Sequence, residues 1–212
     1  MARAKNFEMR EKIYREALRL FSEKGYYATS FANIAEACGV ERTVIQYYFP
    51  YKDYFIQELV EDCLQHIDEM ALLLDEERFD VYGRLYYAGY LFFDFLLNSP
   101  RMKNLTEDIL GQRTLVNAII PLHCQQDKLY TKGEFDEDAT IMSMGGTYEL
   151  MYYRLKNHIP ITSRYLVDKS FLVFAGMHGL GAGEIQEKIG QYNLEEKDIE
   201  ADRGKLEEYL FQ

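Results

Sequence analysis

Cysteine and histidine are scarce in this sequence. Its three cysteines, Cys38, Cys63 and Cys124, are an odd number without CxxC spacing, and its four histidines include no HxxxH pair. Such spacing supports neither a disulfide framework nor a zinc site. The sequence therefore predicts no bound metal and no cofactor.

Long apolar runs are also absent. No stretch approaches the ~18 apolar residues of a membrane span, and patches such as "GYLFFDFLL" are short and interrupted by charge. The N-terminal "MARAKNFEMREKIY" lacks the apolar core of a signal peptide. With 48% hydrophobic and 28% charged residues, the composition is that of a globular protein. We expect a soluble cytoplasmic protein without a membrane partner.

Proline is rare as well, with four residues, at positions 50, 100, 121 and 160. Each of them is expected where a helix starts or stops. Apolar residues recur at helical spacing in the first segment, as in Ile13, Ala17, Leu20 and Phe21. Apolar runs elsewhere are longer than a strand or lack its alternation. We therefore predict an all-α fold.

The same spacing predicts further helices, which we expect to fall into two domains. Beyond the first three helices, further helices are expected at about 51–74, 78–98, 101–111, 112–130, 137–157 and 164–182, followed by a charged C-terminal segment. Residues 1–56 form the first expected domain and residues 57–212 the second. The helix at 51–74 is expected to be shared by both, because no low-complexity linker separates them.

Charge is divided unevenly between these domains. The net charge is −11, which alone argues against a general nucleic-acid binder. Residues 1–55 carry nine Lys/Arg and seven Asp/Glu, a balance of +2, which leaves 15 basic and 28 acidic residues, or −13, for the remainder. An acidic body repels DNA, so only the N-terminal end is expected to face it.

Two short helices joined by a tight glycine turn follow the first helix. Gly25 is expected to end the first helix, and Thr29 or Ser30 to cap a second one over "FANIAEAC". Gly39 supplies the next turn, and residues 41–48 form a third helix. This is the pattern of a helix-turn-helix.

The third helix is expected to have two different faces. Ile34, Ile45 and Phe49 fill a small core with Phe21. The opposite face carries Arg42, Thr43, Gln46 and Tyr47. In the major groove, Arg pairs with guanine, Gln pairs with adenine, and a Thr methyl can meet a thymine methyl.

The stretch "TSFANIAEACGVERTVIQYYFPYKDYF" resembles the DNA-binding domain of the TetR family of bacterial transcriptional repressors. Members typically show a Thr/Ser cap, an I-A dipeptide, A-x-G-V, a recognition helix ending Y-x-[HY]-F, and a Lys shortly afterwards. Here these features are Thr29/Ser30, Ile34-Ala35, Ala37-Cys38-Gly39-Val40, Tyr47-Tyr48-Phe49 and Lys52. The match covers about residues 8–56, and the rest of the chain resembles the family only in length and helical character.

This resemblance implies a double-stranded DNA operator as a partner. It implies that the tyrosines of the third helix and Lys52 contact phosphates, while Phe49 anchors the core. The expected DNA-binding residues are Thr29, Ser30, Arg42, Thr43, Gln46, Tyr47, Tyr48 and Lys52. Two residues depart from the family pattern. Gln46 replaces a common tyrosine, which favours base reading there, and Glu41 replaces a common serine cap and places a negative charge near DNA.

The resemblance also implies that residues 57–212 bind a small effector and form a homodimer. Aromatic, Met and hydroxyl-bearing side chains in this part suit a mostly apolar pocket with a few polar groups. The candidate ligand-binding residues are Tyr86, Tyr90, Phe93, His123, Tyr148 and Tyr152. Each of them also fits an ordinary core position.

Glycines gather in "MSMGGTYEL" and "SFLVFAGMHGLGAGEI". The second stretch does not make GxGxxG, and too few residues follow it for a βαβ unit, so we reject a phosphate-binding loop. We interpret both stretches as helices whose glycines permit close approach across a two-fold axis, where the family dimerises. The candidate dimer-interface residues are Gly145, Gly146, Phe171, Phe174, Gly176 and Gly179.

These observations predict a ligand-responsive transcriptional regulator, a repressor, and not an enzyme. It is expected to bind a palindromic operator as a dimer and to be released by a small-molecule effector. The alternative is a small helical enzyme or carrier that uses the C-terminal cavity. No nucleophile elbow, P-loop or paired catalytic constellation in the sequence supports that alternative.

Overall fold

A computed structural model describes residues 7–131 and 136–211 of the chain. Within these residues the secondary structure consists of helices and contains no strand, as the sequence predicts. In chain order the helices are α1 (Phe7–Lys24), α2 (Phe31–Cys38), α3 (Arg42–Tyr48), α4 (Asp53–Leu72), α5 (Val81–Asn98), α6 (Thr106–Leu110), α7 (Arg113–Thr131), α8 (Glu137–Lys156), α9 (Ser163–Met177), α10 (Ala182–Tyr192) and α11 (Glu196–Leu210).

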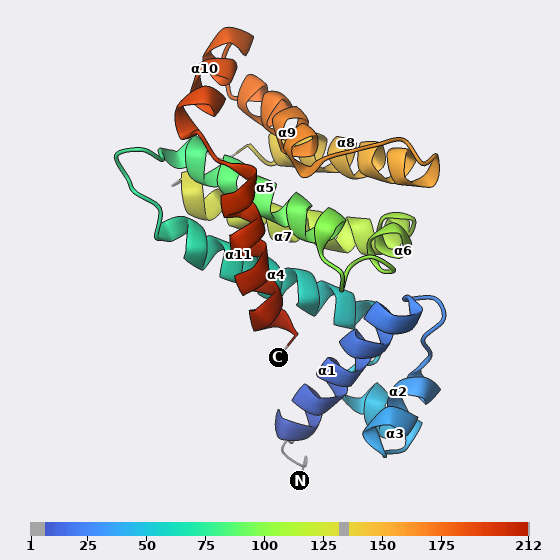
Figure 1. Ribbon diagram of the computed structural model, residues 1–212. Coiled ribbons are helices and arrows are strands. Elements are labelled where there is room, and N and C mark those ends of the chain that lie inside the picture. Colours follow the sequence, from blue (N-terminus) through green and yellow to red (C-terminus); the bar gives the residue numbers. More distant parts are fainter. Residues whose placement is uncertain (1–6, 132–135, 212) are drawn as a thin grey trace.

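The helices form a small head and a larger body (Figure 1). We call α1–α3 together with the first turn of α4 the head, and the remaining helices the body. α4 leads out of the head and packs against α5, α7 and α11. α8 and α9 pack against each other on the far side of the body, and α11 crosses over α4 and α5. One helix, α4, is therefore part of both units.

Two glycines end the first helices, as predicted. Gly25 and Gly39 have φ values of 86° and 67°, in the left-handed region that side chains with a Cβ avoid. At the start of α2, the hydroxyl of Ser30 accepts the N–H of Asn33 at 3.2 Å, and the Asn33 side-chain oxygen accepts the N–H of Ser30 at 2.9 Å. This reciprocal capping box fixes where α2 begins.

The core of the head joins α1 to α4. The predicted core residues Phe21, Ile34, Ile45 and Phe49 are all buried. The guanidinium of Arg10 donates to both carboxylate oxygens of Glu58 on α4, at 2.6 and 2.7 Å. This two-point ion pair fixes the orientation of α1 along α4.

In the body, a buried carboxylate joins three helices. Asp94 of α5 accepts hydrogen bonds from Ser163 of α9 at 2.7 Å, from Arg203 of α11 at 2.7 Å and from Asn98 at 2.6 Å. A buried charge is tolerated only when it is paired and hydrogen-bonded. Asp94 therefore fixes α9 and α11 against α5.

Three predicted elements differ from the structure. The helix expected at 101–111 is reduced to α6, because residues 99–105 form turns before it. The helix expected at 164–182 ends at Met177, where Gly179 takes a φ of 88° and the N–H of Leu180 bonds to the carbonyl of Ala175. The charged C-terminal segment forms two helices, α10 and α11.

The prediction that every proline marks a helix end is wrong for Pro121, which lies inside α7. A proline in a helix interior cannot donate a hydrogen bond to the carbonyl four residues earlier. Pro121 is exposed, so that carbonyl lies on the side of the helix open to water.

Gly39→Ala tests the turn of the helix-turn-helix. We expect a loss of about 1–2 kcal/mol in the free energy of unfolding, because a Cβ is disfavoured at positive φ. An added Cβ would meet no atom within 4 Å, so the cost would be conformational and not steric. The control Gly190→Ala, in the interior of α10 with equally open space, should stabilise the protein by up to about 1 kcal/mol. Urea unfolding of both variants measures the difference, and equal shifts would contradict the left-handed turn.

Candidate functional site

The outer face of α3 is the first candidate site. Arg42, Thr43, Gln46 and Tyr47 are all exposed, whereas Ile45 on the opposite side is fully buried. Within the described residues, neither Arg42 nor Gln46 makes a hydrogen bond or ion pair to another side chain. The structure thus brings the three residues expected to read bases, Arg42, Thr43 and Gln46, together with Tyr47 on one face of one helix.

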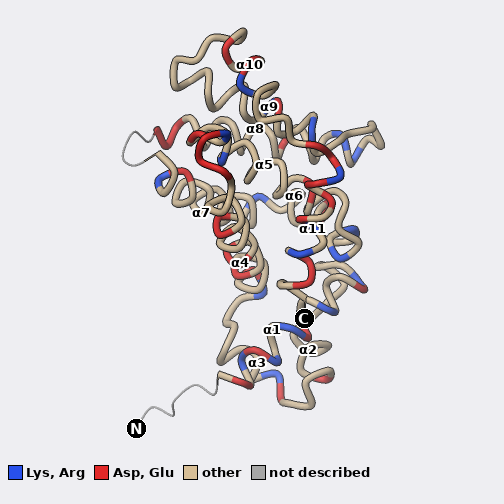
Figure 2. Tube along the Cα trace, turned by 60° about the vertical axis from the view of Figure 1, so that its left-hand side comes forward, with Lys and Arg blue, Asp and Glu red and all other residues tan. Residues whose placement is uncertain are grey.

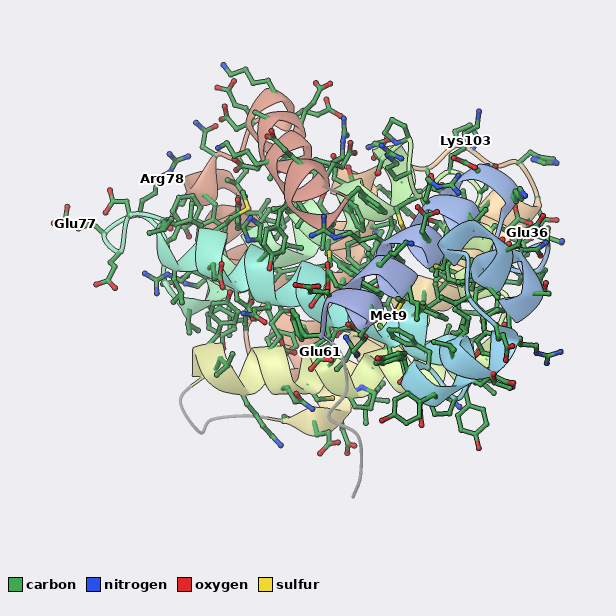
Figure 3. All side chains as sticks on the ribbon, turned by 90° about the horizontal axis from the view of Figure 1, so that it is seen from below. Met9, Glu36, Glu61, Glu77, Arg78 and Lys103 are labelled. Atoms are coloured by element: carbon green, nitrogen blue, oxygen red, sulfur yellow. The ribbon has the colours of Figure 1, made fainter. Side chains whose placement is uncertain are left out.

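Charges of both signs surround this face. Figure 2 shows basic and acidic residues close together in the head and acidic residues along α4. Glu41 precedes α3 without capping it, since its side chain makes no bond to the helix N–H groups. Glu36 of α2 is exposed at the edge of the head, as seen from below in Figure 3. Both carboxylates place negative charge next to the candidate face, which repels the phosphates of DNA.

Thr29 does not belong to this surface, and the prediction that it contacts DNA is wrong. Its side chain is fully buried, and its hydroxyl donates to the carbonyl of Gly25 at 2.9 Å and lies 3.3 Å from that of Leu20. Ser30, the true cap of α2, is exposed beside it. The two residues are adjacent, and only the structure shows which one faces solvent.

Lys52 has structural partners that the sequence does not reveal. Its ammonium donates to the carbonyls of Tyr26 and Thr29, at 2.7 and 3.0 Å, and lies 3.9 Å from the centre of the Tyr26 ring. Burial lowers the pKa of this lysine from its ordinary value. Lys52 therefore holds the loop between α1 and α2 against the start of α4.

Tyr26 is the centre of the contact between head and body. Its hydroxyl donates to Asp53 at the start of α4, and its N–H donates to Asp108 of α6 at 2.9 Å. Asn104, just before α6, donates to the carbonyl of Ser22 at 3.0 Å. The head is thus linked by hydrogen bonds to the body through the loop and helix around α6.

Three exposed tyrosines of the head lie outside the predicted set. Tyr51 and Tyr54 are exposed next to the C-terminal end of α3, with ring centres 5.6 Å apart, and Tyr27 is exposed in the loop before α2. A tyrosine hydroxyl can donate to a phosphate oxygen, so these three residues belong to the candidate DNA-binding surface. The crowding of tyrosines around Tyr47 was a signal in the sequence that could have identified them.

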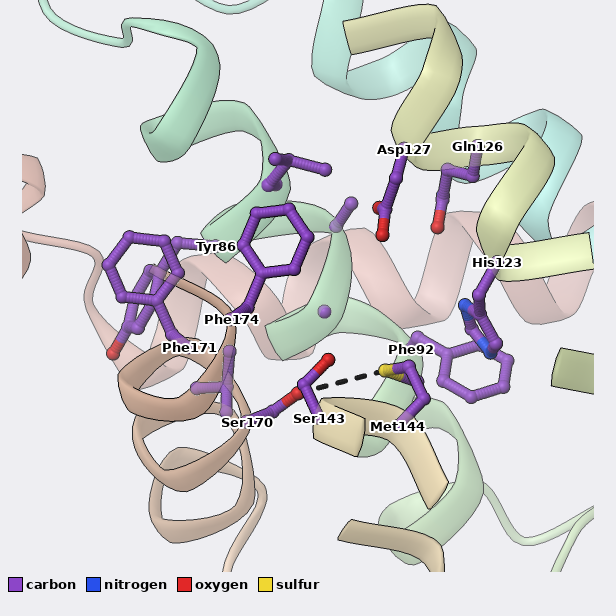
Figure 4. Close-up of a pocket in the computed structure, with 14 residues that line it drawn as sticks. Tyr86, Phe92, His123, Gln126, Asp127, Ser143, Met144, Ser170, Phe171 and Phe174 are labelled. Carbon is purple, nitrogen blue, oxygen red and sulfur yellow. Dashed lines mark hydrogen bonds between the residues drawn. The ribbon is translucent and has the colours of Figure 1, made fainter. Parts of the chain in front are cut away.

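The second candidate site is a cavity inside the body, between α5, α7, α8 and α9 (Figure 4). Its cavity volume is about 50 Å³, within about 500 Å³ of empty space that includes open solvent. Its walls are mostly apolar or aromatic, with a few polar groups from α7, α8 and α9, which is the composition of a small-molecule site. The lining residues used below are Tyr86, Phe92, His123, Asp127, Ser143 and Phe174.

Two of the six predicted ligand-binding residues, Tyr86 and His123, line this cavity. Tyr148 stands directly behind His123, with its hydroxyl 2.5 Å from the histidine Nε2. Tyr90 and Phe93 are fully buried in the core and do not line it. Tyr152 lies on a separate surface groove between α8 and the α6–α7 region. Tyr90, Phe93 and Tyr152 do not line this cavity, and their assignment to ligand binding stays a prediction.

The polar group that sequence reasoning missed is Asp127. It is 9% exposed and accepts the hydroxyl of Thr140 from α8 at 2.5 Å. In the sequence it follows Gln126 and precedes Lys128, so that it reads as part of a solvated stretch. Only its register with His123, four residues earlier on α7, places it on the inner face.

Burial acts in opposite ways on the two titratable groups of the cavity. It raises the pKa of Asp127 from 3.8 to about 6. The hydrogen bond from Thr140 acts to lower this pKa, and the charge of Asp68 acts to raise it further. Burial lowers the pKa of His123 from 6.5 to about 4. At neutral pH, therefore, His123 is neutral and Asp127 carries the negative charge of the cavity.

A second hollow, of about 1170 Å³ of empty space including open solvent, adjoins the cavity. Phe174 lines both spaces, and its ring centre is 4.5 Å from that of His178. Arg84 and Glu76 also line this outer hollow and form an ion pair at 3.2 Å. Phe174 thus stands between the enclosed cavity and a more open space.

The proposed dimer-interface residues divide into three groups. Gly145, Gly146 and Gly176 lie on α8 and α9, and an added Cβ at Gly146 or Gly176 would meet nothing within 4 Å. Phe171 and Phe174 are buried and line the cavity, so their assignment to an interface is wrong. Gly179 lies beyond the end of α9, where it serves the left-handed turn. The outward residues next to these phenylalanines are Leu172, Val173 and Met177.

Within residues 7–131 and 136–211, no helix is both long and apolar enough to cross a bilayer. The same described residues contain no group of three or more His, Cys, Asp or Glu side chains that could hold a metal ion.

Asp127→Asn tests the charge of the cavity through stability. A carboxyl whose folded pKa lies above its unfolded value stabilises the fold at low pH and loses that contribution as the pH rises through the folded pKa. The shift from 3.8 to about 6 corresponds to at most about 3 kcal/mol. We therefore expect the Asn variant to gain stability over the parent between about pH 4 and pH 6 and to remain more stable above.

Thermal unfolding of both proteins across this range measures the gain. His123 is present in both proteins, so its opposite titration cancels in the comparison. A stability difference that does not change with pH would contradict the assignment.

Comparison with known proteins agrees with this architecture. Residues 13–59 match the family model of the bacterial regulatory proteins, tetR family. The chain is 26% identical over 118 residues to the biofilm operon icaADBC HTH-type negative transcriptional regulator IcaR of Staphylococcus epidermidis, over 56% of this chain and 62% of that protein. It is 29% identical over 65 residues to IcaR of Staphylococcus aureus strain Newman, over 31% of this chain and 35% of that protein. The chain therefore spans less than two thirds of either relative.

Solved structures share the fold. Thermus thermophilus FadR, a TetR family transcriptional repressor in complex with lauroyl-CoA, superposes with a TM-score of 0.61 at 20% identity, covering 79% of this chain and 94% of that one. RolR in complex with resorcinol superposes with a TM-score of 0.63 at 17% identity, covering 85% and 92%. At these identities the likeness concerns the fold alone.

Proposed function

Because this chain belongs to the TetR family of bacterial regulatory proteins, we propose that it is a transcriptional repressor that binds a near-palindromic operator as a dimer and is released by a small-molecule effector. The observation that carries the proposal is the outer face of α3, on which Arg42, Gln46 and Tyr47 are exposed. The family consists of regulators and not of enzymes. Residues 1–56 are the proposed DNA-binding domain, and residues 57–212 the proposed effector-binding and dimerisation domain.

Within the head, we assign different tasks to different side chains. Arg42, Thr43 and Gln46 read base edges, because their side chains have the donors and acceptors that distinguish base pairs. Tyr47, Tyr48 and Ser30 contact phosphates and set the position of the head on the duplex. Lys52 has a mixed role, since its ammonium already holds two carbonyls of the loop before α2.

Arg42→Ala and Gln46→Ala test this division against Tyr47→Phe, which removes only a hydroxyl. Either Ala variant should lose roughly 1–3 kcal/mol on the operator and much less on scrambled DNA, because a base contact carries the sequence preference. Tyr47→Phe should lose affinity equally on both DNAs.

Lys103→Ala, which removes an exposed positive charge from the body, controls for net charge. Fluorescence anisotropy at fixed salt measures all four variants. Equal losses on both DNAs for Arg42→Ala and Gln46→Ala would contradict base reading.

The proposed dimer interface is the outer face of α8 and α9. Met142, Val173 and Met177 are exposed there at 58%, 39% and 38%, although they are apolar. Gly146 and Gly176 lie on the same helices with open space above them. An apolar face with small residues allows two copies to approach closely, and a symmetric pair of heads reads two half-sites.

Gly176→Leu tests this interface with a matched control. No atom lies within 4 Å of a Cβ added at Gly176 or at Gly204 of α11, so the protomer accommodates the larger side chain at either position. Gly176→Leu should shift the protein towards monomer in sedimentation velocity and weaken operator binding, because the two heads are no longer held together. Gly204→Leu should remain dimeric and bind normally. A fully dimeric Gly176→Leu protein would place the interface elsewhere.

A path from the cavity to the head lies along α7. The helix carries His123 and Asp127 in the cavity wall, and Gln112 and Thr114 at its start lie 3.4 Å from the carboxylate of Asp53. Asp53 is also the acceptor for Tyr26 in the head. A shift of α7 upon effector binding would therefore change the contacts that hold the head in place.

A further inference from the structure

We propose that the cavity between α5, α7, α8 and α9 binds a small organic cation, an amine with an aromatic or aliphatic body. The inference rests on the proposed function, because it names the chemical class of the effector that such a regulator would bind.

The charge of the cavity is the first observation. Among the described residues that line the cavity, Asp127 is the one acidic residue, and none is Lys or Arg. Its carboxylate makes no ion pair within the described residues, and one oxygen accepts the hydroxyl of Thr140. Figure 4 shows the side chain of Asp127 directed from α7 towards the cavity. A buried carboxylate without a cation is costly, and a bound cation would offset that cost.

The walls of the cavity are the second observation. Aromatic rings of Tyr86, Phe92, Phe171 and Phe174 line it. The faces of such rings attract cations, most strongly where water is excluded. Gln126 and Ser143 add neutral hydrogen-bonding groups. A carboxylate facing aromatic rings matches both parts of an arylalkylamine, its ammonium group and its apolar body.

The groups around Asp127 leave its charge uncompensated at neutral pH. Asp68 of α4 is negative and adds repulsion, and the neutral His123 precedes it on α7. His178 at the end of α9 exerts a weak opposing influence, and Arg84 of α5 lines the outer hollow, where it pairs with Glu76. An anionic effector would meet repulsion from Asp127, so the ligand class differs from the lauroyl-CoA held by the FadR structure.

Three probes of nearly equal shape separate the possible ligand classes: benzylamine, benzyl alcohol and benzoate. Isothermal titration calorimetry of the full chain at about pH 8 should show benzylamine binding at least about tenfold more tightly than benzyl alcohol, the ratio expected for a charge-assisted hydrogen bond over a neutral one. Benzoate should not bind measurably. Equal affinities for the amine and the alcohol, or preferred binding of benzoate, would overturn the proposal.

The same titrations on two variants identify the group that selects the cation. Asp127→Asn should remove the preference for benzylamine over benzyl alcohol. Glu187→Gln, which changes charge equally on the exposed face of α10, should keep it. An Asp127→Asn protein that still prefers the amine tenfold would contradict the assignment.

Dependence on pH provides a test that needs no variant. The amine stays protonated from about pH 8 down to about pH 5, while the carboxyl of Asp127 becomes neutral below its pKa of about 6 in the free protein. Affinity for benzylamine should therefore fall as the pH drops, by up to about tenfold per unit below that value, whereas affinity for benzyl alcohol should not. A pH-independent preference for the amine would overturn the proposal even if Asp127→Asn failed to fold.

Operator binding, measured in parallel, separates this inference from the proposed function. If the chain binds its operator but shows no preference for the amine, the inference fails and the repressor function stands. If benzylamine binds through Asp127 but no operator exists, the cation site stands and the proposed regulation fails.

Discussion

The contact between the head and the body centres on the hydrogen bonds of one residue, Tyr26. Its hydroxyl donates to Asp53, and its N–H donates to Asp108. Its carbonyl accepts a hydrogen bond from the ammonium of Lys52, which also lies over its ring. A hydrogen bond to a charged group contributes about 1.5–3 kcal/mol, a large share of the 5–15 kcal/mol that stabilises a typical domain. The bond to Asp108 links the head to α6 of the body, and the contacts with Asp53 and Lys52 fix the loop before α2 against the start of α4.

The candidate cavity uses the same helix that reaches this junction. α7 places His123 and Asp127 in the cavity and Gln112 beside Asp53. In the proposed regulation, a ligand held by Asp127 would act on α7 and so on the contacts of Asp53, the acceptor of Tyr26. The buried carboxylate of Asp127 lowers the stability of the fold, and a bound cation would offset that cost. In the proposed regulation, this binding energy would change the contacts of Asp53 at the start of α4.

Sequence periodicity and motif spacing were sufficient for the all-α fold, the helix-turn-helix and the outer face of α3, because these depend on neighbours within a few residues. They were insufficient to predict which of two neighbouring residues has its side chain in the core and which has it in solvent. Thr29 and Ser30 are equally good caps by type, and only packing against Leu20 and Gly25 buries the first. Phe171 and Phe174 face the cavity, whereas Leu172 and Val173 face outwards. This difference depends on how α9 packs against α5 and α8. Asp127 was missed because a carboxylate between polar residues in the sequence is expected to be exposed to solvent.

The central claim is that the head reads a specific DNA sequence although the chain carries a net charge of −11. It is tested most directly by selecting bound fragments from fragmented genomic DNA with the purified protein and then footprinting the recovered sites. The account predicts enrichment of a discrete sequence in which two related half-sites are protected, about one helical turn of DNA or a small multiple of it apart. Recovery of fragments without a shared sequence, or protection of a single isolated half-site, would contradict it.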